Sequence, residues 1–142
     1  MTATDELRDR QAIIDVTVAY CWALDTRDWD RLDDIFLPDA IAELGGTFVG
    51  LEAIKARVRA ALEPLAVSQH MVGTHEVRVE GDRATARCYL HAQHVRQLDG
   101  ERQFVVAGRY EDELVRRPAG WRISRRDLVV LWTAGDAAVL EP

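Results

Sequence analysis

The chain has 142 residues, of which 48% are hydrophobic and 30% are charged, and its formal net charge is −6. A chain of this length can bury roughly 68–70% of the surface that its unfolded form exposes, which is enough for one core but not for two. We therefore expect a single domain over residues 1–142. The negative charge, and the absence of any Lys/Arg run longer than two residues, exclude the electrostatic footprint of a protein that binds nucleic acid or an anionic membrane.

The two cysteines and the N-terminal residues indicate where the protein resides. Cys21 and Cys88 are too few and too far apart for a disulfide framework, and no C-x-x-C pair is present. The first ten residues alternate between acidic and basic without an apolar segment, and no stretch reaches the ~18 apolar residues of a membrane span. We expect a reducing compartment, and the predicted location is the cytoplasm.

The first half of the chain has the patterns of helices and one hairpin. Capping residues, acidic first turns, prolines and glycines set the expected boundaries. They predict a helix over about residues 5–25 that Thr4 caps, a short second helix over 28–36, a small hairpin over 40–49 that Gly45-Gly46 interrupts, and a third helix over 51–62.

From Val67 onward the pattern changes to the two-residue period of strands. Turn signals divide this half into four long strands of an antiparallel meander; they are Gly81-Asp82, Asp99-Gly100 and Pro118-Ala119-Gly120. Helices followed by an antiparallel sheet make the segregated α+β pattern. We therefore expect helices over one face of a curved sheet, with a pocket enclosed between them.

Two polar residues interrupt the apolar pattern of the first helix. At about 100° per residue, Asp25 lies within roughly 40° of an apolar stripe formed by Leu7, Ile14, Val18 and Cys21. Asp25 is therefore a candidate functional carboxylate, although a frayed helix end or a cap for the next helix would also place it there. Tyr20 lies about 140° from Asp25, where either a core tyrosine or a catalytic one fits.

Histidines interrupt the first two long strands. Strict alternation places His75 inward, whereas a bulge at Gly73 would turn His70 inward instead, and periodicity leaves both open. His94 continues the inward phase of its strand, and His91 falls on the opposite face. The odd spacing within each pair argues against two histidines chelating a metal from one strand. No metal site is predicted.

Arginines interrupt the last strand. Arg126 shares its phase with Leu128 and Val130, whereas Trp121 and Ile123 share the other phase, so an irregularity is expected near Ser124. Arg126 is the candidate inward residue, and its neighbour Arg125 is the alternative. An exposed arginine that protects an edge strand would also explain the pattern.

Several stretches carry a resemblance to a known family that covers nearly the whole chain: Tyr20–Asp30, Phe36–Ala40, Gly50–Ile54, His70–Thr74, Gly108–Asp112 and Gly120–Arg126. They resemble the SnoaL-like branch of the nuclear transport factor 2-like superfamily, and within it the lyases bile-acid 7α-dehydratase, scytalone dehydratase and lindane dehydrochlorinase. The resemblance implies an α+β cone, in which three N-terminal helices pack on a strongly curved, mostly antiparallel sheet that encloses a pocket. It also implies a homodimer or a higher homo-oligomer.

The resemblance also implies site residues. The catalytic Tyr, Asp, His and Arg of bile-acid 7α-dehydratase correspond in place to Tyr20, Asp25, His70 and Arg126. His94 matches a second inward histidine of scytalone dehydratase. The dehydrochlorinase has a lysine where Tyr20 stands, which argues against halide elimination.

The activity implied is that of a dehydratase-type lyase. It would act through a His-Asp general base, without metal or organic cofactor, on a small apolar substrate that is cyclic or resembles a polyketide or steroid. An isomerase or aldol cyclase with the same dyad is an alternative, and so is a non-catalytic module that binds small molecules. The aromatic residues expected to line the pocket, each of which could instead be plain core, are Trp22, Phe36, Phe48, Tyr110 and Trp132.

Overall fold

The computed structural model describes residues 2–100 and 102–141. Its helices and strands, in chain order, are α1 (Ala3–Asp25), the 3-10 helix η1 (Trp29–Asp34), β1 (Phe36–Glu43), β2 (Thr47–Val49), α2 (Leu51–Leu62), β3 (Val67–Glu80), β4 (Arg83–Val95), β5 (Gln103–Arg117), β6 (Gly120–Gly135) and the 3-10 helix η2 (Ala137–Leu140). The α+β order of the sequence prediction is confirmed.

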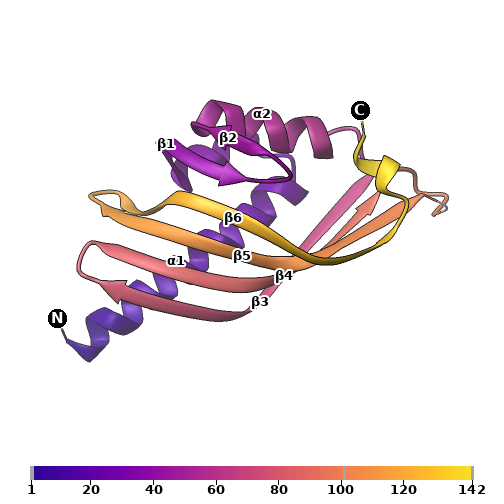
Figure 1. Ribbon diagram of the computed structural model, residues 1–142. Helices are drawn as coiled ribbons and strands as arrows, with labels where there is room; N and C mark the ends of the chain where they lie inside the picture. Colours follow the sequence, from indigo (N-terminus) through magenta and orange to yellow (C-terminus); the bar gives the residue numbers. More distant parts are fainter. Residues whose placement is uncertain (1, 101, 142) are drawn as a thin grey trace.

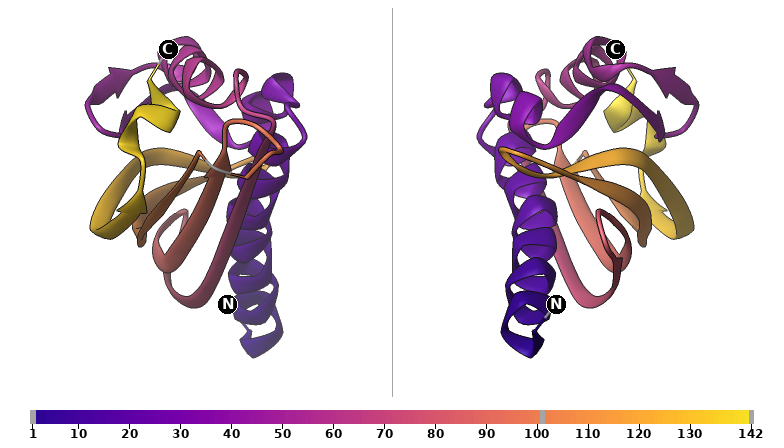
Figure 2. Two further views of the ribbon diagram at one scale, coloured as in Figure 1. Left: turned by 90° about the vertical axis from the view of Figure 1, so that its right-hand side faces the viewer. Right: turned by 90° about the vertical axis from the view of Figure 1, so that its left-hand side faces the viewer.

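The strands form one mixed sheet in the order β2-β1-β6-β5-β4-β3. β1 runs parallel to β6, and every other neighbouring pair is antiparallel. Figure 1 shows α1 crossing behind the long strands, while α2, the β1–β2 hairpin and η2 lie above β6 in this view. Figure 2 shows from the side that α1 lies along one face, and this face supplies the wall of the site described below.

Two parts of the implied cone differ from the structure. The sheet is twisted but not strongly curled: β2 and β3 are its two edges and do not pair with each other, so it remains an open layer. Of the three expected helices, the first and third are the α-helices α1 and α2, whereas the second is a 3-10 helix, η1.

Most predicted boundaries lie within a few residues of the observed ones. α2 has the predicted limits, but α1 starts earlier because Thr2, and not Thr4, accepts the capping hydrogen bond from the backbone N–H of Asp5. The chain becomes extended already at Phe36, so Pro38 lies inside β1 instead of preceding it. The register between β1 and β6 shifts between Phe36 and Ile41, and this irregularity accommodates a residue without an N–H donor.

The buried face of α1 differs from the predicted apolar stripe. Leu7 is 66% exposed and Val18 is 38% exposed, whereas the polar Thr17 is buried. The residues that α1 buries are Asp9, Ile13, Thr17, Tyr20, Cys21, Ala23 and Leu24. The spacing of apolar residues did not predict this face, because the buried polar residues form hydrogen bonds with strands that are distant in sequence.

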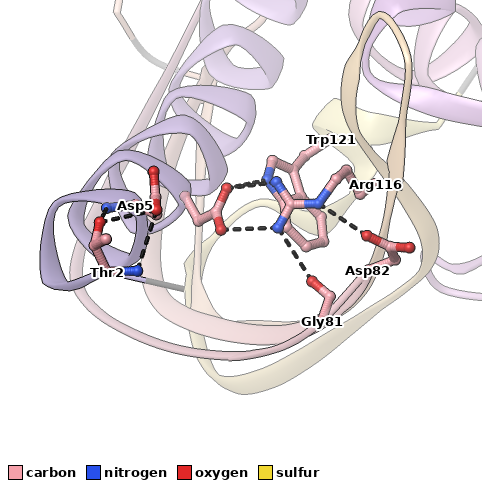
Figure 3. Close-up of polar contacts among 7 residues, drawn as sticks. Thr2, Asp5, Gly81, Asp82, Arg116 and Trp121 are labelled. Atoms are coloured by element: carbon pink, nitrogen blue, oxygen red, sulfur yellow. Dashed lines mark hydrogen bonds and ion pairs between the residues drawn. The ribbon is translucent and has the colours of Figure 1, made fainter.

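Asp9 shows such a partnership near the start of α1. Its carboxylate accepts two hydrogen bonds from the Arg116 guanidinium at 2.7 and 2.8 Å and one from the Trp121 indole N–H at 3.2 Å. Arg116 also binds Asp82 at 3.1 Å and stacks on Trp121, its guanidinium carbon 4.5 Å from the ring centroid. Figure 3 shows these contacts, which tie α1 to the β3–β4 turn and to β5 and β6. They fix the placement of the whole helix on the sheet.

The inward phase predicted for the strand of His94 is confirmed. The inward residues of β4 are all buried, namely Ala84, Ala86, Cys88, Leu90 and Ala92. None of the helices within residues 2–100 and 102–141 combines the length and the apolar composition that crossing a membrane would require.

Candidate functional site

Asp25 and His70 meet where the last turn of α1 faces β3. The His70 ring Nδ1 lies 2.6 Å from Asp25 Oδ1, and the His70 backbone N–H donates to Asp25 Oδ2 at 2.7 Å. Because a carboxylate only accepts, Nδ1 carries the proton, and the other ring nitrogen, Nε2, holds a lone pair when the ring is neutral. Nε2 makes no hydrogen bond to the described residues. The arrangement is that of a base oriented by a carboxylate.

Two further residues, which the sequence analysis did not single out, hold the carboxylate. Ser68 Oγ donates to Asp25 Oδ1 at 2.9 Å, and Arg27 Nη1 donates to Ser68 Oγ at 2.8 Å. Arg27 has a φ of +61°, and its Nη1 also donates to the Leu24 carbonyl oxygen at 2.6 Å. Burial alone would raise the pKa of Asp25, but the hydrogen bonds and charge of His70 and the bond from Ser68 hold it below its usual value. The carboxyl group of Asp25 is therefore ionised, and each of its two oxygens accepts at least one hydrogen bond.

A bulge in β3 explains how both histidines of this strand face α1. The register between β3 and β4 shifts between Gly73 and Glu76, and Thr74 has a φ of +56°. The extra residue changes the phase, so the odd spacing no longer puts His70 and His75 on opposite faces. His75 Nε2 lies 2.8 Å from Thr17 Oγ1. The alternation in the sequence could not choose between these two histidines. In the structure His70 lies beside Asp25, and His75 contacts Thr17 in the middle of α1.

His70 lies on the wall of a cavity of about 100 Å³. The wall is mostly apolar and includes Leu24, Leu90 and Leu128, while its polar residues are Tyr20, Arg57, His70, His94 and Tyr110. α1, α2 and the four long strands all contribute, and Leu140 of η2 adds a C-terminal contact. His70, which Asp25 orients, thus borders a small and mostly apolar space.

His94 faces this cavity from β4, as its predicted phase requires. Its Nδ1 lies 2.9 Å from the Phe104 carbonyl oxygen and must donate to it, so its Nε2 is an acceptor when the ring is neutral. Burial lowers its pKa, which favours that neutral form. The His70 and His94 rings are nearly perpendicular, with centroids 5.8 Å apart.

Arg126 is buried completely, but it is not part of the cavity wall. It forms two hydrogen bonds to Asp112, at 2.8 and 2.7 Å, and its guanidinium carbon lies 4.4 Å from the Tyr20 ring centroid and 3.9 Å from that of Tyr110. Its Nη1 has no hydrogen-bond partner among the described residues. Arg126 therefore packs on the rings of Tyr20 and Tyr110 outside the cavity wall. The side chain of the alternative residue, Arg125, is 40% exposed. The register shift between Glu113 and Leu114 confirms the expected irregularity opposite Ser124.

Tyr20 is the tyrosine of the constellation and is buried against the core. Its ring contacts those of Phe36 and Tyr110 edge to face. Burial raises the pKa of Tyr20 to about 12. The hydroxyl therefore stays protonated near neutral pH and can donate a hydrogen bond.

Of the five aromatic residues expected in the pocket, only Tyr110 lines the cavity. Phe36 is core, and Phe48 lies beneath the Arg57 guanidinium. Trp22 is 59% exposed and Trp132 is 52% exposed, so their assignment to the pocket is wrong for this chain. Trp22 lies on an exposed part of α1, and Trp132 follows the β5–β6 register shift at Gly108, which turns it to the uncovered face.

Asp112 and Arg57 were missed for different reasons. Asp112 continues the inward phase of Tyr110 and Leu114, and its charge in that phase was the available signal. Arg57 carries no such signal, because helical arginines are usually exposed.

Across residues 2–100 and 102–141, no three His, Cys, Asp or Glu side chains are grouped closely enough to hold a metal ion.

Comparison with known proteins assigns the family. Residues 5–127 match the family described as SnoaL-like domain. An uncharacterized protein of Mycobacterium bovis is 36% identical over 129 residues, which cover 89% of this chain and 88% of that protein.

Two solved structures share the fold at lower identity. A Novosphingobium aromaticivorans protein described as a candidate scytalone dehydratase has a TM-score of 0.85 and 20% identity, with 95% of this chain and 92% of that chain covered. A hexachlorocyclohexane dehydrochlorinase of Novosphingobium barchaimii has a TM-score of 0.82 and 21% identity, with 96% and 95% covered. At these identities the likeness concerns the fold.

Proposed function

The chain belongs to the SnoaL-like domain family, and from that premise we propose that it is a lyase that eliminates water from a small, largely apolar substrate without a cofactor. The observation that carries this proposal is the His70–Asp25 pair on the wall of an apolar cavity, with His70 Nε2 not bonded to the described residues. Two relatives in fold are described as a dehydratase and a dehydrochlorinase, and both names denote eliminations.

In the proposed reaction, His70 Nε2 takes a proton from a carbon next to a carbonyl group. The electrons of that C–H bond form the new double bond, the bond to the hydroxyl on the neighbouring carbon breaks, and the hydroxyl leaves as water with a proton from the imidazolium. Asp25 stabilises the imidazolium while it exists. Tyr20 donates a hydrogen bond to the carbonyl oxygen as charge develops there.

Arg126 takes a different part from the one that the resemblance implies. Since its guanidinium stacks on Tyr20 and pairs with Asp112, we assign it to holding Tyr20 in place instead of touching substrate. His94, with its Nε2 lone pair, accepts a hydrogen bond from the leaving hydroxyl. The cavity of about 100 Å³ is small and mostly apolar, and in this proposal it receives an apolar ring of the substrate.

The test is turnover of small cyclic β-hydroxy carbonyl compounds, with products weighed by mass spectrometry. Loss of one water supports elimination, whereas conversion at unchanged mass would assign the dyad to an isomerase. His70→Ala and Asp25→Ala should each lower turnover by ~10²–10⁴. The matched control is His75→Ala, a histidine on the same strand that also contacts α1 but lies outside the cavity wall, and it should stay near wild type. If the His70 and Asp25 variants stay within about tenfold of wild type, the proposal is wrong.

We also propose that the protein is a homodimer that pairs through the sheet face opposite α1. Exposed apolar side chains gather there from β3, β4 and β6, at Met71, Tyr89, Leu131 and Trp132. Beneath Trp132, the buried His91 Nδ1 has no hydrogen-bond partner among the described residues. Light scattering should give twice the mass of one chain, and Trp132→Glu should give the monomer. Trp22→Glu, on the outer side of α1, is the control.

A further inference from the structure

Arg57 is a cation in the wall of the cavity without an anion beside it. It extends from α2, is partly buried, and shares the wall with His70, His94, Tyr20 and Tyr110. No carboxylate oxygen of the described residues lies within ion-pair distance of it. The other interior arginine, Arg126, pairs with Asp112 in two hydrogen bonds. A guanidinium that borders an apolar space without a counter-ion is a binding site for an anion.

The guanidinium is held in one orientation. Its Nε donates to the Leu44 carbonyl oxygen at 3.1 Å, and its central carbon lies 5.3 Å from the Phe48 ring centroid. Gly45 closes the third side: a Cβ at that residue, whose φ is +71°, would stand 3.0 Å from Arg57 Nη2. The turn between β1 and β2 is thus built around this side chain.

These contacts use Nε and leave the terminal nitrogens Nη1 and Nη2 without a hydrogen bond to the described residues. Two parallel N–H donors match the two oxygens of a carboxylate in a bidentate pair. Within an apolar wall the attraction is also stronger than in water, because fewer water dipoles screen it.

We propose that Arg57 binds a carboxylate of the substrate, so that the protein acts on small cyclic carboxylic acids. This inference rests on the proposed function, because it concerns the substrate of the same cavity. Arg57 binds the carboxylate from α2, while His70 faces the ring from β3, so the two contacts orient the ring between them. A neutral analogue would leave the guanidinium desolvated and unpaired, which makes Arg57 a specificity-determining residue.

The test compares benzoate with benzamide, which has nearly the same shape but no charge. Both are titrated into the isotope-labelled full-length protein at pH 7.5, and dissociation constants are taken from amide chemical shifts. We expect the wild type to bind benzoate at least about 10-fold more tightly than benzamide, as a charge-assisted hydrogen-bonded pair requires. Arg57→Met should remove this preference and leave benzamide binding within about twofold.

Two further variants make the outcome decisive. Arg59→Met is the matched control, because Arg59 lies on the same helix, is exposed, pairs with Glu63, and should keep the full preference. Arg57→Lys keeps the charge but loses the paired donors, and should keep only part of the preference. If Arg57→Met does not fold, the change in the preference for benzoate is measured in Arg57→Lys instead.

The proposal is overturned if wild type binds benzoate no better than benzamide, or if the preference survives in Arg57→Met. His70→Ala separates this result from the proposed reaction, because binding of benzoate does not require a base. If His70→Ala still prefers benzoate over benzamide and its turnover equals that of wild type, the lyase proposal is refuted and the carboxylate site is supported. If only Arg57→Met loses the preference for benzoate, and turnover falls in His70→Ala, both proposals are supported.

Discussion

Replacing Asp112 by alanine tests whether the interior around Tyr20 is as dry as the structure indicates. The change removes both hydrogen bonds to Arg126, at 2.8 and 2.7 Å, while the guanidinium stays at 0% exposure. Asp112 is the only carboxylate among residues 2–100 and 102–141 that pairs with it. Arginine cannot relieve this by losing its proton. Breaking a buried pair from one side costs about 3–5 kcal/mol, a large fraction of the 5–15 kcal/mol that stabilises a typical domain. At about 3 °C per kcal/mol for a chain of this size, Tm should fall by about 9–15 °C.

Urea and thermal unfolding followed by circular dichroism measure this loss. Glu111→Ala is the matched control, because the neighbouring Glu111 pairs with Arg109 at 2.7 Å where both side chains are more than a third exposed. Its cost should stay within about 1 kcal/mol. The double variant Asp112→Leu with Arg126→Met should recover most of the lost stability, since apolar residues of similar volume can replace a buried pair. A loss below about 1 kcal/mol in Asp112→Ala would show that Arg126 reaches water, and the account of Tyr20 would be wrong.

Three other substitutions or conditions test separate parts of the structure. Ser68→Ala removes one donor to Asp25, so the pKa of Asp25, measured by carboxyl NMR, should rise from its depressed value, and turnover should fall by about tenfold. Asp9→Ala removes the contacts of Arg116 and should lower the urea-derived free energy of unfolding by about 1–3 kcal/mol. Burial depresses the folded-state pKa of His94 below the usual 6.5, so its contribution to stability is complete above that pH and is lost as pH falls through the folded-state pKa. His94→Gln should flatten the decline of stability below about pH 6.5, and an unchanged slope would contradict this.

The fold was predictable wherever local signals set it. Gly50 and Pro64 gave α2 its observed limits, and the glycine-containing turns gave the four long strands. The buried face of α1 was not predictable from apolar spacing, because Asp9 and Thr17 are buried through partners far along the chain. Arg116, which pairs with Asp9, is 107 residues away.

The candidate site was predictable in part. The resemblance brought Asp25 and His70 together, and the structure places their side chains in contact. The sequence pattern alone could not choose between His70 and His75, since the choice depends on a bulge that changes the phase only when β3 pairs with β4. Arg126 was correctly placed inward, but its partner Asp112 belongs to the neighbouring strand, and that pairing requires the register of β5 and β6.

The same bulge links the stability of the fold to the geometry of the candidate base. Asp9, Thr17 and Asp25 are spaced eight residues apart on α1, and each interval turns the helix by about 80°. Each binds a partner on the sheet, Asp9 through Arg116 and the other two through the histidines of β3. If α1 slid along β3, all three contacts would break together, because they lie on one rigid helix. The contact between Asp25 and His70 is therefore one of three along the same helix, and the bulge, by turning both histidines toward α1, makes the site part of the attachment of the helix.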